Sequence, residues 1–234
     1  MSKIIKLIIV NTITSIRLIG AFVLPFIYLK YGANIAAIFV IILFLSDAID
    51  GFLARTLKVS TFFGSILDAA SDKILNIISF IILGIEYNIM IAPLAIEAAI
   101  FYTVYSTYRY GGNVQATIIG KIKMIILSVF VILSFVLLSL PTLNLKYHFI
   151  NKLIGATDLI IHIFGFIILF ACLVALFDYV GRNKEARLNP KSEEIKKEKK
   201  KKKSFKILLS NLFDTEYYKE HKDESIMKQF YINN

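Results

Sequence analysis

Hydrophobic residues in this chain come in long continuous runs rather than in the one-sided stripes of a soluble amphipathic helix. Runs of about 20 residues match the length that a helix needs to cross a bilayer. The pattern predicts six membrane-spanning helices, at about residues 14–31, 34–55, 65–86, 89–108, 119–140 and 157–180. Residues 2–12 are predicted to form a short interfacial helix, because Asn11 interrupts the first apolar stretch. The expected fold class is an all-α integral membrane protein.

The pattern changes abruptly after Gly181. Residues 182–234 hold 15 Lys and Arg against 9 Asp and Glu, with a lysine run at 199–203. Such a segment buries too little apolar surface to fold alone. We therefore expect a membrane domain over 1–181 and a mobile basic tail over 182–234. Apolar residues at helical spacing over 205–213 suggest that this tail lies on anionic lipid, and a solvated tail is the alternative.

Basic residues are unevenly shared between the two sides of the predicted bundle. The loops on one side carry Lys30, Lys146 and Lys152, whereas the opposite side carries the remaining basic residues and the tail. Because positive loops stay in the cytoplasm, both termini are expected there. The predicted cytoplasmic side is also where the acidic residues described below gather.

Composition supports a membrane protein. The chain has 234 residues, 57% of them hydrophobic and 19% charged, with a mean hydropathy of +0.68. An average soluble domain is about 25% charged. The single cysteine, Cys172, excludes an internal disulfide and is expected to fill apolar space.

Four of the eight acidic residues in 1–181 lie within 26 positions: Asp47, Asp50, Asp68 and Asp72. Their i, i+3 and i, i+4 spacings place each pair on one helix face. Ionised carboxylates at membrane depth repel one another and require cations. Oxygen ligands favour Mg²⁺ or Mn²⁺, which bind together with substrate phosphates, and two such ions can clamp a group during displacement.

Small residues and one arginine accompany the aspartates. Gly51, Ala54 and Gly64 leave room for a ligand near the backbone, and Arg55 offers a positive fork for a phosphate. The alternative is that the small residues mark a helix crossing.

The whole pattern, D-x2-D-G-x2-A-R-x8-G-x3-D-x3-D, resembles the signature of CDP-alcohol phosphatidyltransferases. The resemblance runs from Asn11-Thr12-x-Thr14-x-x-Arg17 to the sixth predicted span. It implies a six-helix membrane enzyme that transfers a phosphatidyl group from CDP-diacylglycerol to an alcohol and releases CMP. It also implies roles: Asp47, Asp50, Asp68 and Asp72 hold two divalent cations, Asp72 is the general base, and Gly51, Ala54, Arg55 and Gly64 contact the cytidine diphosphate.

The prediction of the acceptor alcohol depends on less specific sequence patterns. The LDxxxDK and GKIK patterns resemble phosphatidylglycerophosphate synthases, which use glycerol 3-phosphate, and cardiolipin synthases, which use phosphatidylglycerol. We expect glycerol 3-phosphate, because basic residues on the cytoplasmic side suit a small phosphorylated acceptor. The candidates are Lys73, Arg109, Lys121 and Lys123, with membrane anchoring as the alternative. Residues 69–71 depart from the commonest synthase pattern, which contains a proline.

Other classes of protein stay open at this point. An intramembrane prenyltransferase also holds diphosphates with aspartates, a cation or proton carrier also has intramembrane acids, and an inactive relative would be a lipid-binding scaffold. The resemblance further implies a homodimer in a bacterial plasma membrane, in contact with membrane lipid. No nucleic-acid partner is expected. Glu97 receives no role, and the histidines lack the spacing of metal ligands.

Overall fold

The computed structural model describes residues 3–112, 114–115, 117–143, 147–190, 201–202, 205–221 and 231–232. Helices make up nearly all of this part: α1 (Lys3–Thr56), α2 (Phe62–Glu86), α3 (Ala92–Arg109), α4 (Ile118–Ser139), α5 (His148–Gly155), α6 (Thr157–Leu188), α8 (Phe205–Phe213) and α9 (Thr215–His221). Two 3₁₀ turns, η1 (Asn88–Ile91) and η2 (Leu140–Leu143), follow α2 and α4. The two-residue strands β1 (Lys201–Lys202) and β2 (Tyr231–Ile232) pair antiparallel.

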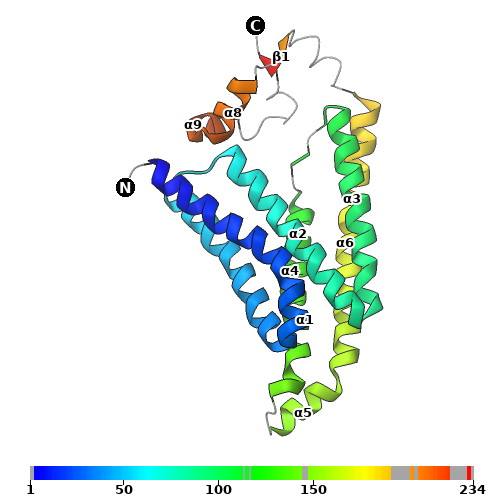
Figure 1. Ribbon diagram of the computed structural model, residues 1–234. Coiled ribbons are helices and arrows are strands. Elements are labelled where there is room, and N and C mark those ends of the chain that lie inside the picture. Colours follow the sequence, from blue (N-terminus) through cyan, green and yellow to red (C-terminus); the bar gives the residue numbers. More distant parts are fainter. Residues whose placement is uncertain are drawn as a thin grey trace.

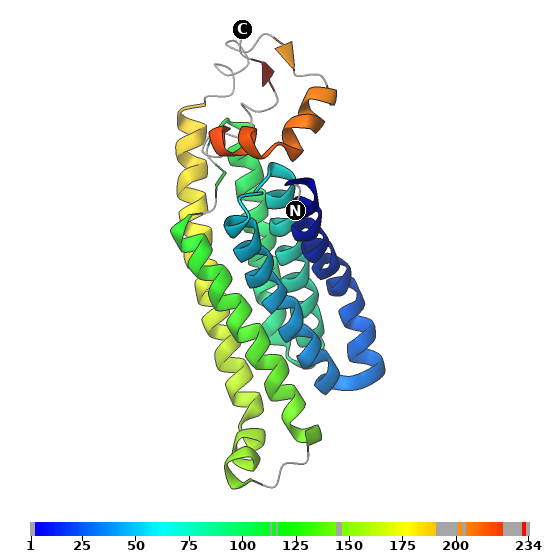
Figure 2. The same cartoon turned by 90° about the vertical axis from the view of Figure 1, so that its left-hand side faces the viewer.

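Helix α1 consists of two arms that fold back on each other (Figure 2). The reversal is at Gly32, whose φ of 77° and ψ of −176° belong to a region that essentially only glycine adopts. This turn separates the predicted spans 14–31 and 34–55. Residues 3–12 are helical, but they run without a break into the first arm instead of forming a short helix of their own. Asn11 and Thr12 are tolerated inside this arm.

Four described helices are long and apolar enough to cross a membrane: Ile4–Thr56, Asn88–Arg109, Ile118–Leu143 and Thr157–Leu188. This differs from the six predicted spans in two ways. The first of the four contains both arms of α1, and α2 is not among them. Helix α2 carries Asp68, Asp72 and Lys73 in its first half and Glu86 at its end, which interrupt its apolar stretch.

The helices pack as an elongated bundle in which α1 contacts α2 and α4, and α6 contacts α3 and α4 (Figure 1). Its centre is made of fully buried side chains such as Leu24, Leu75, Phe80 and Phe135. Many large apolar side chains face outward instead, among them Phe170 at 70% exposure. An apolar exterior around a bundle of apolar helices is the pattern expected for a protein surrounded by lipid.

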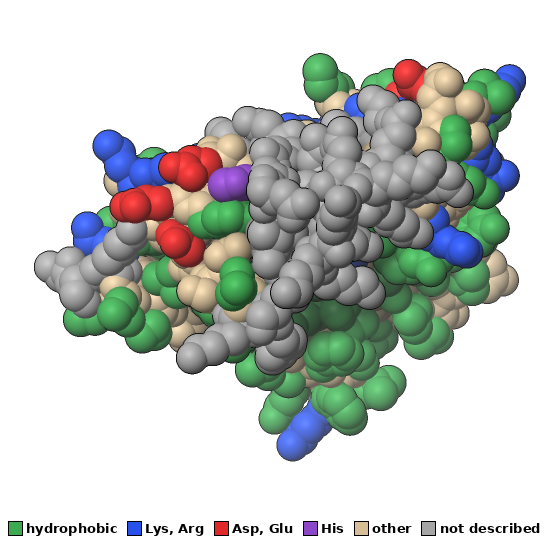
Figure 3. All heavy atoms as spheres, turned by 90° about the horizontal axis from the view of Figure 1, so that it is seen from above, with side chains coloured by type: hydrophobic (Ala, Val, Ile, Leu, Met, Phe, Trp, Pro, Cys, Tyr) green, Lys and Arg blue, Asp and Glu red, His purple; other side chains and the backbone are tan. Residues whose placement is uncertain are grey.

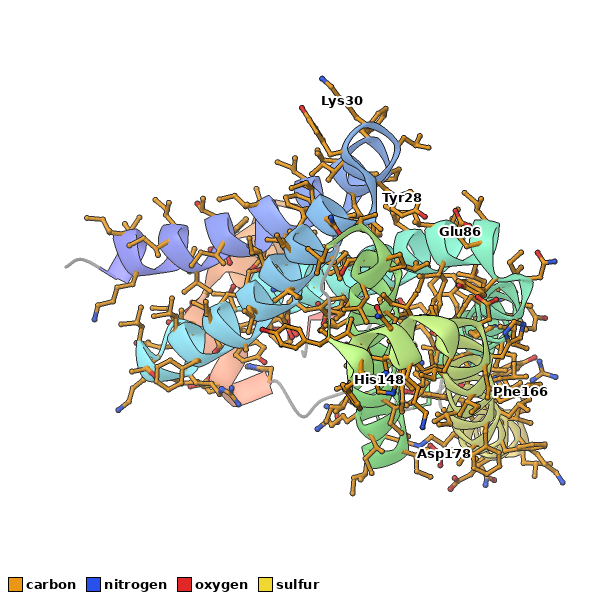
Figure 4. All side chains as sticks on the ribbon, turned by 90° about the horizontal axis from the view of Figure 1, so that it is seen from below. Tyr28, Lys30, Glu86, His148, Phe166 and Asp178 are labelled. Atoms are coloured by element: carbon orange, nitrogen blue, oxygen red, sulfur yellow. The ribbon has the colours of Figure 1, made fainter. Side chains whose placement is uncertain are left out.

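The two ends of the bundle differ. The beginning of α1 and the helices α8 and α9 lie at one end, and α5 lies at the other (Figure 1). Seen from above, the first end carries acidic and basic side chains, with hydrophobic ones along the flanks (Figure 3). At the opposite end, Tyr28 Oη donates a hydrogen bond to Glu86 Oε1 at 3.1 Å, and Lys30 points away from the bundle (Figure 4).

The C-terminal part has more structure than its composition predicts. Helix α6 continues past the predicted boundary at residue 181 and ends at Leu188, and α8 packs against α2. The rings of Phe63 and Phe213 lie 4.7 Å apart. Leu208 and Leu212 are half-buried, whereas Phe213 stays 42% exposed beside Phe63, so α8 covers the beginning of α2 only in part. Most of the lysine run at 199–203 lies outside the described residues.

The turn at Gly32 gives a test of the fold. Gly32→Ala should lower the free energy of unfolding by about 1–3 kcal/mol, because alanine is strained at this φ and ψ. Gly181→Ala is the control: this glycine is helical, a Cβ there would meet open space, and stability should stay equal or rise slightly. Thermal unfolding of both variants in detergent measures the difference. Equal melting temperatures would contradict the role of Gly32.

Candidate metal and nucleotide site

Two antiparallel segments bring the four aspartates together. The second arm of α1 carries Asp47 and Asp50, and the first half of α2 carries Asp68 and Asp72. Carboxylate oxygens of Asp47, Asp50 and Asp68 lie within 4.8 Å of one another. Their burial is uneven, since the Asp50 side chain is 3% exposed and that of Asp68 is 45% exposed. The cluster therefore has one closed side and one open side.

A buried arginine lies among the carboxylates. Arg17, on the first arm of α1, is fully buried. Its guanidinium donates to all four aspartates: from Nη1 to Asp47 Oδ1 at 2.8 Å, to Asp68 Oδ1 at 3.2 Å and to Asp72 Oδ1, and from Nη2 to Asp50 Oδ2. Its Nε has no hydrogen-bond partner among the described residues. Arg17 thus connects both pairs of aspartates to the first arm.

Thr14, one helical turn before Arg17, holds the most buried carboxylate. Its Oγ1 donates to Asp50 Oδ2 at 2.7 Å. The sequence pointed to Thr14 and Arg17 only through the family resemblance, and no role was predicted for either. An arginine within an otherwise apolar span was the signal that could have identified Arg17, because such residues face the bundle interior and pair there.

The residues present fit divalent cations. All four side chains offer carboxylate oxygens, the donors that Mg²⁺ and Mn²⁺ prefer. One arginine against four ionised aspartates leaves a formal charge of −3 in the cluster. Buried or half-buried carboxylates in such excess require further positive charge. The open side next to Asp47 and Asp68 is where it can enter.

A cavity of about 230 Å³ adjoins the cluster. Its lining contains Asp50 and Asp68 together with the four predicted nucleotide-binding residues Gly51, Ala54, Arg55 and Gly64. Thr61 begins α2 as its N-cap, with Oγ1 accepting from the Gly64 backbone N–H at 3.1 Å. A Cβ on Gly64 would lie 3.1 Å from Asn11 Oδ1 and would narrow the cavity.

Arg55 lies at the exposed edge of this cavity. Its Nε donates to the Gly51 carbonyl oxygen at 3.0 Å, which orients the guanidinium within one turn of the helix. A Cβ on Gly51 would meet nothing closer than Arg55 Nη2 at 4.0 Å, so packing does not require glycine there. The absence of a side chain at Gly51 instead keeps the cavity wall open.

A second cavity, of about 450 Å³, lies between α2, α3 and α4. Lys73 and Glu97 line it, together with apolar residues such as Phe80 and Phe101. Lys73 Nζ lies 5.5 Å from the centre of the Phe101 ring. The cavity is therefore mostly apolar, with one lysine next to the aspartate cluster.

Of the four basic residues proposed for the acceptor, the structure brings two close to this second cavity. Lys123 is buried and its Nζ donates to Glu97, so an ion pair that the sequence did not predict links α3 and α4. Cys172 Sγ lies 3.7 Å from the same Glu97 oxygen, and the cysteine is buried as expected. Arg109 and Lys121 are exposed and line neither cavity.

Comparison with known proteins places the chain in a family. The model of the CDP-alcohol phosphatidyltransferase family matches residues 7–176, so the chain belongs to this family. Among curated proteins it is similar to the CDP-diacylglycerol--glycerol-3-phosphate 3-phosphatidyltransferases of Wigglesworthia glossinidia brevipalpis and Yersinia enterocolitica. The first is 39% identical over 83 residues, which is 33% of this chain and 45% of the relative. The second is 35% identical over 69 residues, covering 30% and 36%. The matches therefore span less than half of either relative, and no solved structure matches.

The network around Arg17 predicts a specific loss of stability. Arg17→Met should lower the free energy of unfolding of the metal-free protein by about 3 kcal/mol, because it leaves the buried Asp50 without a counter-charge. Mn²⁺ should recover part of the loss by supplying positive charge to the carboxylates. The measurement is the melting temperature in EDTA and in Mn²⁺.

Lys30→Met is the matched control, because Lys30 lies on the same arm of α1 and points away from the bundle (Figure 4). Its melting temperature should equal that of the unchanged protein under both conditions. If Arg17→Met behaved in the same way, Arg17 would not be what stabilises the cluster.

Proposed function

We propose that this chain transfers a phosphatidyl group from CDP-diacylglycerol to glycerol 3-phosphate and releases CMP. The observation that carries the proposal is the cluster of four aspartates around Arg17, beside a cavity lined by Gly51, Ala54, Arg55 and Gly64. Membership of the CDP-alcohol phosphatidyltransferase family supports the reaction class. The names of the two similar bacterial proteins support glycerol 3-phosphate as the acceptor.

The proposed site holds the substrate diphosphate next to the carboxylates. Asp47, Asp50 and Asp68 hold one divalent ion, and Asp47, Asp68 and Asp72 hold a second. When bound, two such ions neutralise a diphosphate and a leaving nucleotide. Arg17 keeps the carboxylates oriented, and Gly51 and Gly64 let the nucleotide approach the backbone.

Asp72 is the proposed general base. Its carboxylate takes the proton of the acceptor hydroxyl while that oxygen bonds to the phosphorus of the phosphatidyl group. The bond from this phosphorus to the CMP oxygen breaks, and CMP leaves. Asn76 Nδ2 donates to the Asp72 carbonyl oxygen at 2.9 Å, which supports this turn of α2.

The acceptor phosphate is proposed to bind near Lys73, one residue after Asp72 and in the wall of the second cavity. A primary ammonium group is a suitable partner for a phosphate. Lys123, the second proposed acceptor contact near this cavity, lies in an ion pair with the lining residue Glu97. Arg109 and Lys121, both exposed, attract the anionic substrate toward the site.

The mostly apolar wall of the second cavity favours one alternative acceptor. A lipid alcohol such as phosphatidylglycerol, the acceptor of cardiolipin synthases, would place an acyl chain against Phe80 and Phe101. Glycerol 3-phosphate and phosphatidylglycerol are therefore the two acceptors to compare first.

In the membrane, the proposed arrangement has six crossings: the two arms of α1, then α2, α3, α4 and α6. The beginning of α1 and the helices α8 and α9 lie at the same end, which agrees with both termini in the cytoplasm (Figure 1). We propose a bacterial plasma membrane as the location, a homodimer as the assembly, and residues 1–181 and 182–234 as membrane domain and tail.

Removing the proposed base tests the chemistry. Asp72→Asn should lower kcat for CMP release by about 10²–10⁴-fold, because the acceptor hydroxyl loses its proton acceptor. Binding of CDP-diacylglycerol should persist in Mn²⁺. CMP formed from CDP-diacylglycerol and glycerol 3-phosphate by the purified protein is the quantity to measure. Pyrophosphate as the product, or no CMP with any alcohol, would contradict the proposed reaction.

Replacing the proposed phosphate partner tests the acceptor site. Lys73→Met should raise KM for glycerol 3-phosphate about tenfold, because a charge-assisted hydrogen bond is lost, and leave KM for CDP-diacylglycerol unchanged. Lys152→Met, in α5 at the opposite end, is the control and should change neither KM. Faster CMP release with phosphatidylglycerol than with glycerol 3-phosphate would favour the cardiolipin synthase alternative.

A further inference from the structure

A residue of the C-terminal tail lines the nucleotide cavity. Tyr218, in α9, is part of the same lining as Arg55, Gly64 and Asp68. The other residues of this lining lie between Val10 and Asp68, so Tyr218 comes from the far end of the chain. It also lies beyond residues 7–176, which match the family. The wall that it adds therefore comes from outside the segment that matches the family.

The position of Tyr218 is determined by several contacts. Asp214 caps α9, because its Oδ1 accepts from the backbone N–H groups of Glu216 at 2.8 Å and Tyr217 at 3.3 Å. The ring of Phe62, the first residue of α2, lies 4.9 Å from the Tyr218 ring and 6.0 Å from the Tyr217 ring, edge to face in both cases. Aromatic pairs in this geometry are attractive.

A further aromatic contact joins α8, the helix before α9, to the beginning of α2. The rings of Phe63 and Phe213 lie 4.7 Å apart, so α8 and α9 both dock on the beginning of α2. Thr215, the first residue of α9, is buried. The docking of α8 and α9 on α2 thus holds Tyr218 at the cavity.

The location along α2 indicates which part of the substrate Tyr218 meets. Phe62 precedes Asp68 by six residues, which is about 9 Å along the helix axis. The diphosphate belongs at the aspartates, so the nucleoside extends from there toward the beginning of α2. An aromatic ring at that end presents a flat apolar face, on which a nucleobase can stack.

We propose that Tyr218 is a nucleotide-binding residue whose ring stacks on the cytosine base of CDP-diacylglycerol, so that docked α9 completes the site. This inference rests on the proposed function. It assigns the tail a direct part in binding the lipid nucleotide.

The lack of tryptophan in the chain permits a direct experiment. Tyr218→Trp in the full-length protein introduces a single indole at the cavity, and CMP with Mn²⁺ should quench its fluorescence in a saturable way. Glu220→Trp is the matched control, because Glu220 lies on the same helix and is exposed. Its fluorescence should stay constant over the same titration.

Kinetics supply a second readout. Tyr218→Ala should raise KM for CDP-diacylglycerol about tenfold, in line with the loss of one base stack, with kcat and KM for glycerol 3-phosphate unchanged. Tyr218→Phe keeps the ring and should retain the original KM. An unchanged KM in Tyr218→Ala, or a lower one, would overturn the inference, since α9 would then only pack beside the site or obstruct it.

Binding of radiolabelled CMP to the unchanged protein separates this inference from the proposed function. Bound CMP together with an unresponsive Tyr218→Trp overturns the role of Tyr218 and leaves the transferase standing. No CMP bound in Mn²⁺, and none released from CDP-diacylglycerol, overturns the proposed function and the inference with it.

Discussion

The contact of one buried guanidinium with four carboxylates is the constraint on which this structure depends. Arg17 comes from the first arm of α1, whereas the aspartates come from the second arm and from α2. Four acids in an apolar bundle would repel one another, so a fixed cation among them permits these segments to pack closely. The return of α1 at Gly32 places Arg17 opposite the aspartates.

Helix α2 lies between the two cavities and contributes lining residues to both. Gly64 and Asp68 line the cavity assigned to the nucleotide, and Lys73 and Asn76 line the one assigned to the acceptor. Asp72 lies between these pairs along the helix. A hydroxyl entering from the second cavity and a phosphorus held at the first would therefore meet at a single turn of α2. In the proposed reaction, one rigid element would position both reactants, which is the geometry that displacement chemistry requires.

Local patterns in the sequence were sufficient to predict apolar helices and to single out the four aspartates that surround Arg17. Apolar runs predicted six spans from the length that bilayer thickness sets, and four described helices are long and apolar enough to cross a membrane. The spacing of Asp47, Asp50, Asp68 and Asp72 placed each pair on one helix face, and the structure brings the pairs together. The short helix expected over 2–12 is continuous with the first arm, because Asn11 and Thr12 do not break a helix whose other residues favour it.

Contacts between distant segments were decided by the tertiary structure alone. The pairing of Lys123 with Glu97 depends on how α3 and α4 pack, and the position of Tyr218 depends on aromatic contacts with Phe62. The sequence by itself determined the apolar helices, the aspartate pairs and the family pattern, since each can be read along one continuous stretch of the chain. The ion pairs and the tail residue that lines the cavity depend on contacts between residues more than 20 positions apart in the sequence. Helical periodicity does not encode such contacts.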